Sequence, residues 1–160
     1  MKRLRVFLAN VGRKAFLLPQ VPPPMGLMYL AGYLRTKFDM DVHICNQRRE
    51  DISLEEVAKR AVEFGADVVG IGSLTPSAYM VPPLTTMVRQ GLPDALILLG
   101  GPTVRASGED ALDGTAADAA VSGEGELSFE MVLREWFDGD RDLSKIPALI
   151  WRSPDGSVVR

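Results

Sequence analysis

Three glycine-rich segments hold the residue types that are best suited to binding a ligand. They are residues 72–75 (Gly-Ser-Leu-Thr), 100–103 (Gly-Gly-Pro-Thr) and 123–126 (Gly-Glu-Gly-Glu). Glycine lets the backbone approach a ligand closely, and the Ser73 and Thr75 hydroxyls can donate or accept hydrogen bonds. Each segment ends a short aliphatic run, which is typical of a buried parallel strand. Because ligands bind at the carboxyl ends of strands in open α/β sheets, we predict one composite binding site.

The placement of these segments indicates a wide, flat ligand. An FMN-type phosphate loop would follow the first strand and would be rich in hydroxyls, but residues 10–25 contain no serine or threonine. The small residues follow the third, fourth and fifth strands instead, so a macrocycle fits better than a nucleotide. Purely structural roles are the alternative, with Gly70 and Gly72 allowing close packing and residues 100–101 forming a tight turn. Glu124 and Glu126 could form an acid/base pair, but we favour an interaction with a helix dipole and assign no catalytic residue.

Alternating strand and helix patterns must position these segments. Strands are expected at residues 4–9, 40–45, 66–72, 95–99 and 117–121. Helices are expected at residues 26–37, from an N-cap at Ser53 to Gly65, at about 79–90 and at 127–137. Pro82 and Pro83 must lie in the first turn of the third helix or distort it. A weak helical turn is expected at 109–112. The strand at 95–99 has no polar side chain, which places it at the centre of the sheet.

These elements predict an α/β fold with a doubly wound, five-stranded parallel sheet. The Rossmann/flavodoxin-like order 2-1-3-4-5 is favoured, with its switch point between the first and third strands. The long loop from Asn10 to Met25, which contains Pro19, Pro22, Pro23 and Pro24, flanks that point and is expected to be functional. Residues 148–152 and 157–160 flank a Pro-Asp-Gly turn and predict a C-terminal hairpin extension. We therefore expect a binding domain at 1–140 and a linker or hairpin at 141–160.

Composition excludes several classes of protein. A chain of 160 residues that is 46% hydrophobic and 24% charged suits one domain. The net charge is −3 and the 18 basic residues are scattered, so we expect no nucleic-acid partner. No membrane span or signal peptide is recognisable, and we expect a cytoplasmic protein without a membrane partner. Cys45, the one cysteine, excludes an internal disulfide or a cysteine-ligated cluster made by this chain alone, and is expected to be a small buried hydrophobe.

Four segments in order resemble the N-terminal cobalamin-binding domain of cobalamin-dependent radical S-adenosylmethionine (SAM) proteins. They are residues 24–34 (Pro-Met-Gly-Leu-Met-Tyr-Leu-Ala-Gly-Tyr-Leu), 66–75 (Ala-Asp-Val-Val-Gly-Ile-Gly-Ser-Leu-Thr), 98–103 (Leu-Leu-Gly-Gly-Pro-Thr) and 118–126, which ends in Gly-Glu-Gly-Glu. The resemblance covers essentially the whole chain, and the spacing of the four segments makes it specific.

The resemblance implies that a corrin ring lies over the carboxyl ends of the strands. The nucleotide tail would pass between strands and helices, beside Ser73, Leu74, Gly100 and Gly101. The cofactor-binding residues that it implies are Asn10, Pro24, Met25, Gly26, Leu27, Ser73, Leu74, Thr75, Gly100, Gly101, Pro102, Thr103, Gly123, Glu124, Gly125 and Glu126.

The sequence departs from related corrinoid domains of the methionine synthase type. Those domains supply a lower cobalt ligand from an Asp-x-His-x-x-Gly motif after the first strand, whereas residues 10–14 here contain no histidine. His43, the one histidine, lies within the second strand pattern. The resemblance therefore implies cobalamin with its own base displaced and no histidine in its place. The lower position of cobalt could then hold water, another side chain or no ligand at all. We assign no metal ligand in this chain.

A radical SAM reaction also needs a [4Fe-4S] cluster held by three cysteines, which Cys45 alone cannot supply. The resemblance thus implies a radical SAM catalytic domain, in the same gene or a separate chain, that brings SAM and the cluster. The parent enzyme would be a methyltransferase or would catalyse another radical rearrangement, and this chain alone would not complete the reaction. A stand-alone corrinoid carrier is an alternative.

Two other classes are disfavoured. A receiver-like signalling domain needs an acidic cluster after the first strand and an acceptor aspartate after the third, where this chain has Asn10 and Gly72-Ser73. A nucleotide-binding oxidoreductase needs Gly-x-Gly-x-x-Gly after the first strand, and residues 11–14 (Val-Gly-Arg-Lys) do not supply it.

Overall fold

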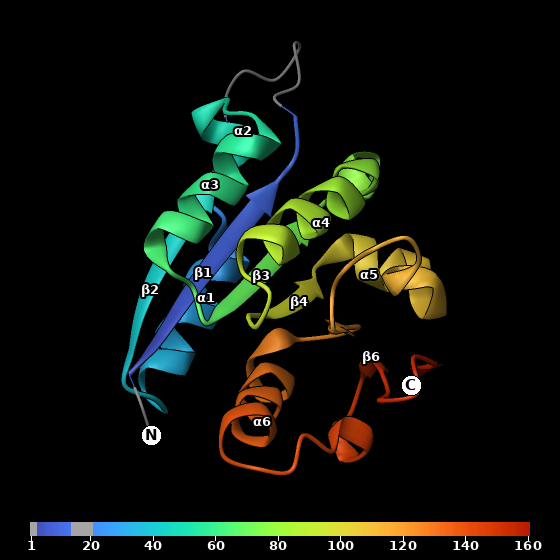
Figure 1. Cartoon of the computed structure of the whole chain (residues 1–160). Coiled ribbons are helices and arrows are strands. Elements are labelled where there is room, and N and C mark those ends of the chain that lie inside the picture. Colours follow the sequence, from blue (N-terminus) through green and yellow to red (C-terminus); the bar gives the residue numbers. More distant parts are fainter. Residues whose placement is uncertain (1–2, 14–20) are drawn as a thin grey trace.

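A seven-stranded sheet in the order β2-β1-β3-β4-β5-β6-β7 forms the centre of the molecule (Figure 1). The structure is a computed structural model, and it describes residues 3–13 and 21–160. The first five strands are parallel, and β6 and β7 are antiparallel to their neighbours. The predicted order 2-1-3-4-5 is confirmed. The strands are β1 (Leu4–Val11), β2 (Met40–Asn46), β3 (Val68–Ser73), β4 (Leu96–Gly100), β5 (Ala119–Val121), β6 (Leu149–Arg152) and β7 (Val158–Val159).

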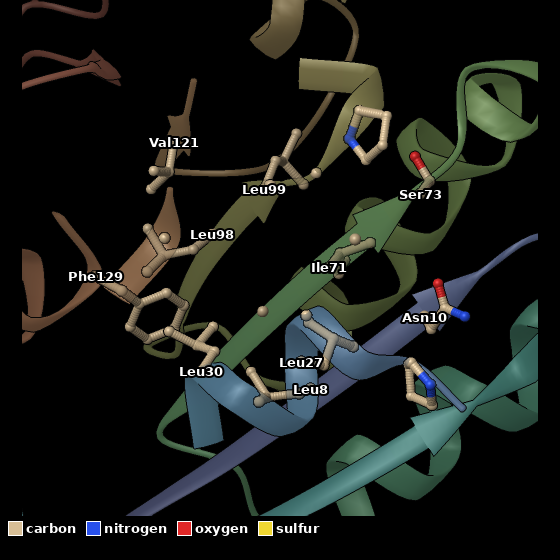
Figure 2. A pocket seen from close by; sticks show the side chains of 18 of the residues that line it. Leu8, Asn10, Leu27, Leu30, Ile71, Ser73, Leu98, Leu99, Val121 and Phe129 are labelled. Carbon is tan, nitrogen blue, oxygen red and sulfur yellow. The ribbon is translucent and has the colours of Figure 1, made fainter. Parts of the chain in front are cut away.

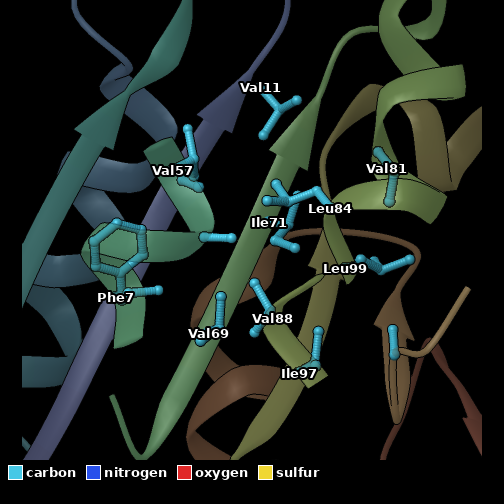
Figure 3. Close-up of a cluster of buried hydrophobic side chains, with 14 of the residues drawn as sticks. Phe7, Val11, Val57, Val69, Ile71, Val81, Leu84, Val88, Ile97 and Leu99 are labelled. Atoms are coloured by element: carbon cyan, nitrogen blue, oxygen red, sulfur yellow. The ribbon is translucent and has the colours of Figure 1, made fainter. Parts of the chain in front are cut away.

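Helices cover both faces of this sheet, as a doubly wound fold requires. Helices α1 (Met25–Arg35) and α6 (Gly125–Phe137) pack on one face. Helices α3 (Leu54–Phe64), α4 (Val81–Gly91) and α5 (Pro102–Ser107) pack on the other, over the apolar cluster in Figure 3. Alternation along β1 supplies both layers, because Leu8 faces α1 and α6 whereas Phe7 faces α3. The remaining elements are α2 (Gln47–Glu50) and the 3-10 turns η1 (Thr75–Met80), η2 (Gly108–Leu112) and η3 (Leu143–Lys145).

Several local predictions are confirmed at the level of single residues. The Ser53 hydroxyl caps α3 by accepting from the Glu56 backbone N–H, and Gly65 ends the helix with a φ of 64°. Pro82 and Pro83 lie in the first turn of α4, where no intrahelical N–H bond is lost. Residues 96–99 of β4 are fully buried, and β4 is the middle strand of the sheet.

Other boundaries differ from the prediction. Helix α5 was not predicted, and it begins directly after the Gly-Gly pair; it is too short to show a helical period in the sequence. Helix α6 begins at Gly125 rather than Leu127, and β1 extends to Val11. Residues 14–20 of the predicted loop from Asn10 to Met25, including Pro19, lie outside the described residues.

The predicted hairpin is present, and it extends the sheet. Strand β6 pairs with β5, and Ile150 and Trp151 are buried in the two apolar clusters on opposite faces. The segment after residue 140 therefore contributes side chains to the core. Within the described ranges, no helix has the length and apolar character to cross a membrane.

Candidate functional site

A cavity of about 490 Å³ opens at the carboxyl ends of β1, β3, β4 and β5, on the face covered by α1 and α6 (Figure 2). It brings together residues from all three glycine-rich segments, from the end of β1 and from the start of α1. The predicted site residues that line it are Asn10, Pro24, Met25, Gly26, Leu27, Ser73, Leu74, Gly100, Gly101, Pro102, Gly123, Glu124, Gly125 and Glu126. The three glycine-rich segments thus form one continuous surface, as their positions at the ends of parallel strands predict.

A trough without side chains forms the floor of this cavity. The β1–β3–β4 register aligns Asn10 with Gly72 and Gly100, and aligns Leu8 with Gly70 and Leu98 one pleat below. Residues two apart in a strand face the same side, so three glycines lie on one patch of the sheet. A Cβ atom at Gly100 would meet no atom within 4 Å. A Cβ atom at Gly72 would come no closer than 3.8 Å, to Leu27 Cδ2, whereas one at Gly70 would lie 2.7 Å from Leu8 Cδ2. The trough is therefore open at Gly72 and Gly100, and the Leu8 side chain fills the space at Gly70.

The deeper walls are residues that were not predicted as site residues. They are mostly apolar and come from the sheet and from the two covering helices: Leu8, Leu30, Gly70, Ile71, Leu98, Leu99, Val121 and Phe129. Gly72 of the first glycine-rich segment lines the cavity beside them. Figure 2 shows Leu30 of α1 beside Phe129 of α6 at the inner end. The period of two in β3 and β4 could have extended the prediction from strand ends to strand interiors. The contribution of Phe129 depends on how α6 packs, which no local pattern shows.

Thr75 and Thr103, also predicted, do not line the cavity. Thr75 begins η1. Thr103 lies in α5 beside a smaller cavity of about 150 Å³. Its hydroxyl accepts from the Ser73 hydroxyl at 2.7 Å and donates to the Ser73 carbonyl oxygen at 2.9 Å. This pair joins β3 to α5, so the Ser73 hydroxyl proton is already engaged by protein.

Gly101 has a conformation that other residues rarely adopt. Its φ of 84° and ψ of −170° place it in a region that is essentially limited to glycine. A Cβ atom there would lie 3.5 Å from the Ser73 carbonyl oxygen, which is an ordinary contact, so the backbone conformation and not the lack of space restricts this position to glycine. The two glycines of the pair therefore differ, because Gly101 shapes the turn into α5 whereas Gly100 leaves space in the cavity.

The acidic residues of the third segment lie at the start of α6. Glu124 is the residue that precedes the helix, and Glu126 is in its first turn. Carboxylates at this position interact favourably with the helix dipole. Both also line the cavity and make its rim acidic.

The described residues contain no group of three or more histidine, cysteine, aspartate or glutamate side chains that could hold a metal ion. His43 lies on β2, outside the cavity, and its ring stacks on Phe7 with centroids 5.1 Å apart. Cys45 is buried on the other face of the sheet, and burial raises the pKa of its thiol to about 11. The expectation that Cys45 is a buried hydrophobe is confirmed.

Comparisons with known proteins identify the family of the chain. Residues 17–133 match the family model described as "B12 binding domain". An uncharacterized methyltransferase of Pyrococcus horikoshii is 31% identical over 131 residues, which is 81% of this chain and 28% of the relative. The anaerobic magnesium-protoporphyrin IX monomethyl ester cyclase of Rubrivivax gelatinosus is 28% identical over 140 residues, covering 86% of this chain and 25% of the relative.

The fold matches a solved structure over almost its full length. The radical SAM methyltransferase TsrM from Kitasatospora setae, solved with cobalamin and a [4Fe-4S] cluster, superposes with a TM-score of 0.81 at 20% identity. The match covers 99% of this chain and 30% of TsrM. This chain thus spans less than a third of the length of each of these proteins. Together with the family match over residues 17–133, these comparisons show that the chain belongs to the B12-binding domain family. Its fold is that of the matching segment of TsrM, a radical SAM methyltransferase.

Proposed function

We propose that the cavity holds cobalamin with its corrin ring over the carboxyl ends of β1, β3, β4 and β5 and its nucleotide tail in the trough. The observation that carries this proposal is the trough itself. Gly72 and Gly100 leave one patch of the sheet without side chains, Leu8 and Phe129 close it at Gly70, and α1 and α6 wall it on either side. A flat aromatic base needs such a slot with apolar walls, and Leu30 and Phe129 supply them at the inner end.

The sixteen predicted residues would then have different roles. Residues at the mouth, including Met25, Gly26 and Glu124, would contact the ring, and Ser73 and Gly100 would contact the tail. Thr103 would act through Ser73, whose hydroxyl it engages. Gly101 would fix the turn between β4 and α5 through its positive φ.

We further propose that the tail's base is displaced from cobalt and that no histidine of this chain replaces it. A base lying in the trough cannot also reach the metal over the strand ends. His43 is outside the cavity on β2, and the described residues directly after β1 are Gly12 and Arg13. These positions support a lower face without an imidazole ligand.

The length of the relatives supports a catalytic partner domain. We propose that residues 1–140 form the body of the cofactor domain and that residues 141–160, which add β6 and β7 to its sheet, lead from it to a radical SAM domain in the same or another chain that brings SAM and a [4Fe-4S] cluster. Bound cobalamin supplies a cobalt centre that can carry a methyl group. Methyl transfer is therefore our first candidate for the parent reaction. Cyclisation is the second, because one relative is a cyclase.

Binding can be tested on the chain as it stands. Protein incubated with hydroxocobalamin and then desalted is expected to keep a corrinoid absorption spectrum. A colourless protein with an intact circular dichroism spectrum would refute cobalamin binding. After reduction to cobalt(II), electron paramagnetic resonance is expected to lack the splitting that a coordinated nitrogen produces. Three-line splitting from one nitrogen would refute the displaced-base, histidine-free arrangement while leaving binding intact.

A further inference from the structure

A pair of asparagines at the β1–β2 edge of the cavity has a fixed orientation that the proposed function does not yet explain. Asn10 and Asn46 are register partners at the ends of the two strands. Asn10 lines the cavity, whereas Asn46 is only 6% exposed. Their amides form a hydrogen-bond relay, and the surrounding groups fix which atom of each amide is the oxygen.

The Asn46 amide is oriented by α2. Its Oδ1 accepts from the Arg49 backbone N–H at 3.3 Å, so Asn46 is the N-cap of that short helix. Its own backbone N–H donates to Glu50 Oε1 at 3.1 Å, and Glu50 forms an ion pair with Arg60 of α3. Turning the Asn46 amide around would set its NH₂ group against the Arg49 N–H. The Asn46 oxygen is therefore held in place.

The Asn46 oxygen then orients Asn10. Asn10 Nδ2 donates to Asn46 Oδ1 at 3.1 Å, and the reversed Asn10 amide would bring two oxygens together. The Asn10 oxygen is left without a hydrogen-bond partner among the described residues, at a side chain that lines the cavity at the end of β1 (Figure 2). The relay thus presents an acceptor to the ligand.

Maintaining this relay has a cost to the fold. Asn46 Nδ2 is buried and has no hydrogen-bond partner among residues 3–13 and 21–160, and such a donor destabilises the folded state. A serine at position 46 could cap α2 without burying an amide NH₂. Helix capping alone therefore does not account for an asparagine, whereas orienting Asn10 does.

We infer that Asn10 is a specificity-determining residue whose oxygen accepts a hydrogen bond from a carboxamide N–H on the edge of the corrin ring, and that Asn46 is its positioning residue. This inference rests on the proposed function. A fixed acceptor favours a neutral amide donor and disfavours a carboxylate or phosphate at the same place, since both of those offer only oxygen lone pairs. Asn10 therefore selects corrinoids whose side chains are amidated.

The test compares two ligands on wild-type protein and on Asn10→Leu, which has a similar size without the acceptor. The ligands are cobalamin and a cobalamin derivative whose ring carboxamides have been hydrolysed to carboxylates. Asn10→Leu is expected to weaken cobalamin binding by about 3- to 10-fold, the loss of one hydrogen bond. It should affect the carboxylate derivative less, so the preference for cobalamin falls. If Asn10→Leu does not fold, Asn10→Ala gives the same comparison.

Asn46→Ser isolates the positioning role, because serine keeps the cap but is too short to reach Asn10. It removes the buried, unpartnered Nδ2 group, so it is expected not to lower the melting temperature, and it should lower the preference for cobalamin. In the Asn10→Leu background it should have no further effect on binding. An unchanged ligand preference in Asn10→Leu, or an equal effect of Asn46→Ser in both backgrounds, would overturn the inference. Failure of wild-type protein to bind cobalamin would instead refute the proposed function.

Discussion

Replacing Gly100 by leucine should close the cavity while leaving the fold intact. A Cβ atom at Gly100 meets nothing within 4 Å, and the residue has no positive φ, so the side chain extends into open space. Stability should stay within about 1 kcal/mol of wild type and can rise, since a replaced glycine loses less chain entropy on folding. Bound cobalamin would have to share that space. Forcing extra atoms into a filled site costs about 1–3 kcal/mol, or roughly 5- to 150-fold in affinity.

Two further glycine variants make this comparison decisive. Gly32→Leu adds the same side chain at an exposed position of α1, where a Cβ atom again meets nothing within 4 Å, and should bind cobalamin as wild type does. Gly101→Leu should instead lower stability by about 1–3 kcal/mol, because its φ of 84° suits glycine alone. The assays are spectral titration with hydroxocobalamin and urea unfolding. Wild-type affinity in Gly100→Leu would refute the assignment of the trough to the cofactor.

Three other properties can be checked independently. Cys45 should not react with a thiol reagent at mildly alkaline pH until the protein unfolds. Because burial raises the pKa of its thiol from 9.0 to about 11, the contribution of the protonated thiol to the free energy of unfolding should be complete below pH 9.0 and be lost as the pH rises towards about 11. Rapid labelling of folded protein would contradict its burial. The Tyr33 hydroxyl donates to Glu130 Oε2 at 2.5 Å and, with Arg134, lowers the pKa of that carboxyl. The contribution of the ionised Glu130 to the free energy of unfolding should therefore be present above pH 4.5 and be lost as the pH falls through the depressed pKa. Tyr33→Phe should flatten this acid-side dependence in urea unfolding, and an unchanged profile would argue against the bond. Ala148 has a φ of 56°, so Ala148→Gly should raise stability by about 1 kcal/mol, and a loss of stability would show that its conformation carries no strain.

Much of the fold was predictable because its signals are local. Short aliphatic runs that end in glycine predict buried parallel strands, and the run at 95–99 identified the central strand. The Ser53 cap and Gly65 are encoded within one turn of each helix end. Helix α5 was missed, since six residues carry no measurable periodicity. The attachment of the hairpin to β5 depends on pairing between segments far apart in the chain.

The sequence alone determined which residues face the edge of the sheet, because strand ends and small residues are properties of neighbouring positions. It also determined that this chain lacks the cysteines for a cluster. Only the tertiary structure decided that Gly70, Gly72 and Gly100 align into a trough, since strand register joins residues about thirty positions apart. The structure likewise separated Gly100 from Gly101, and it showed that Ser73 is engaged by Thr103 and Asn10 by Asn46. These are contacts between strand ends and later helices or strands, and no local pattern encodes them.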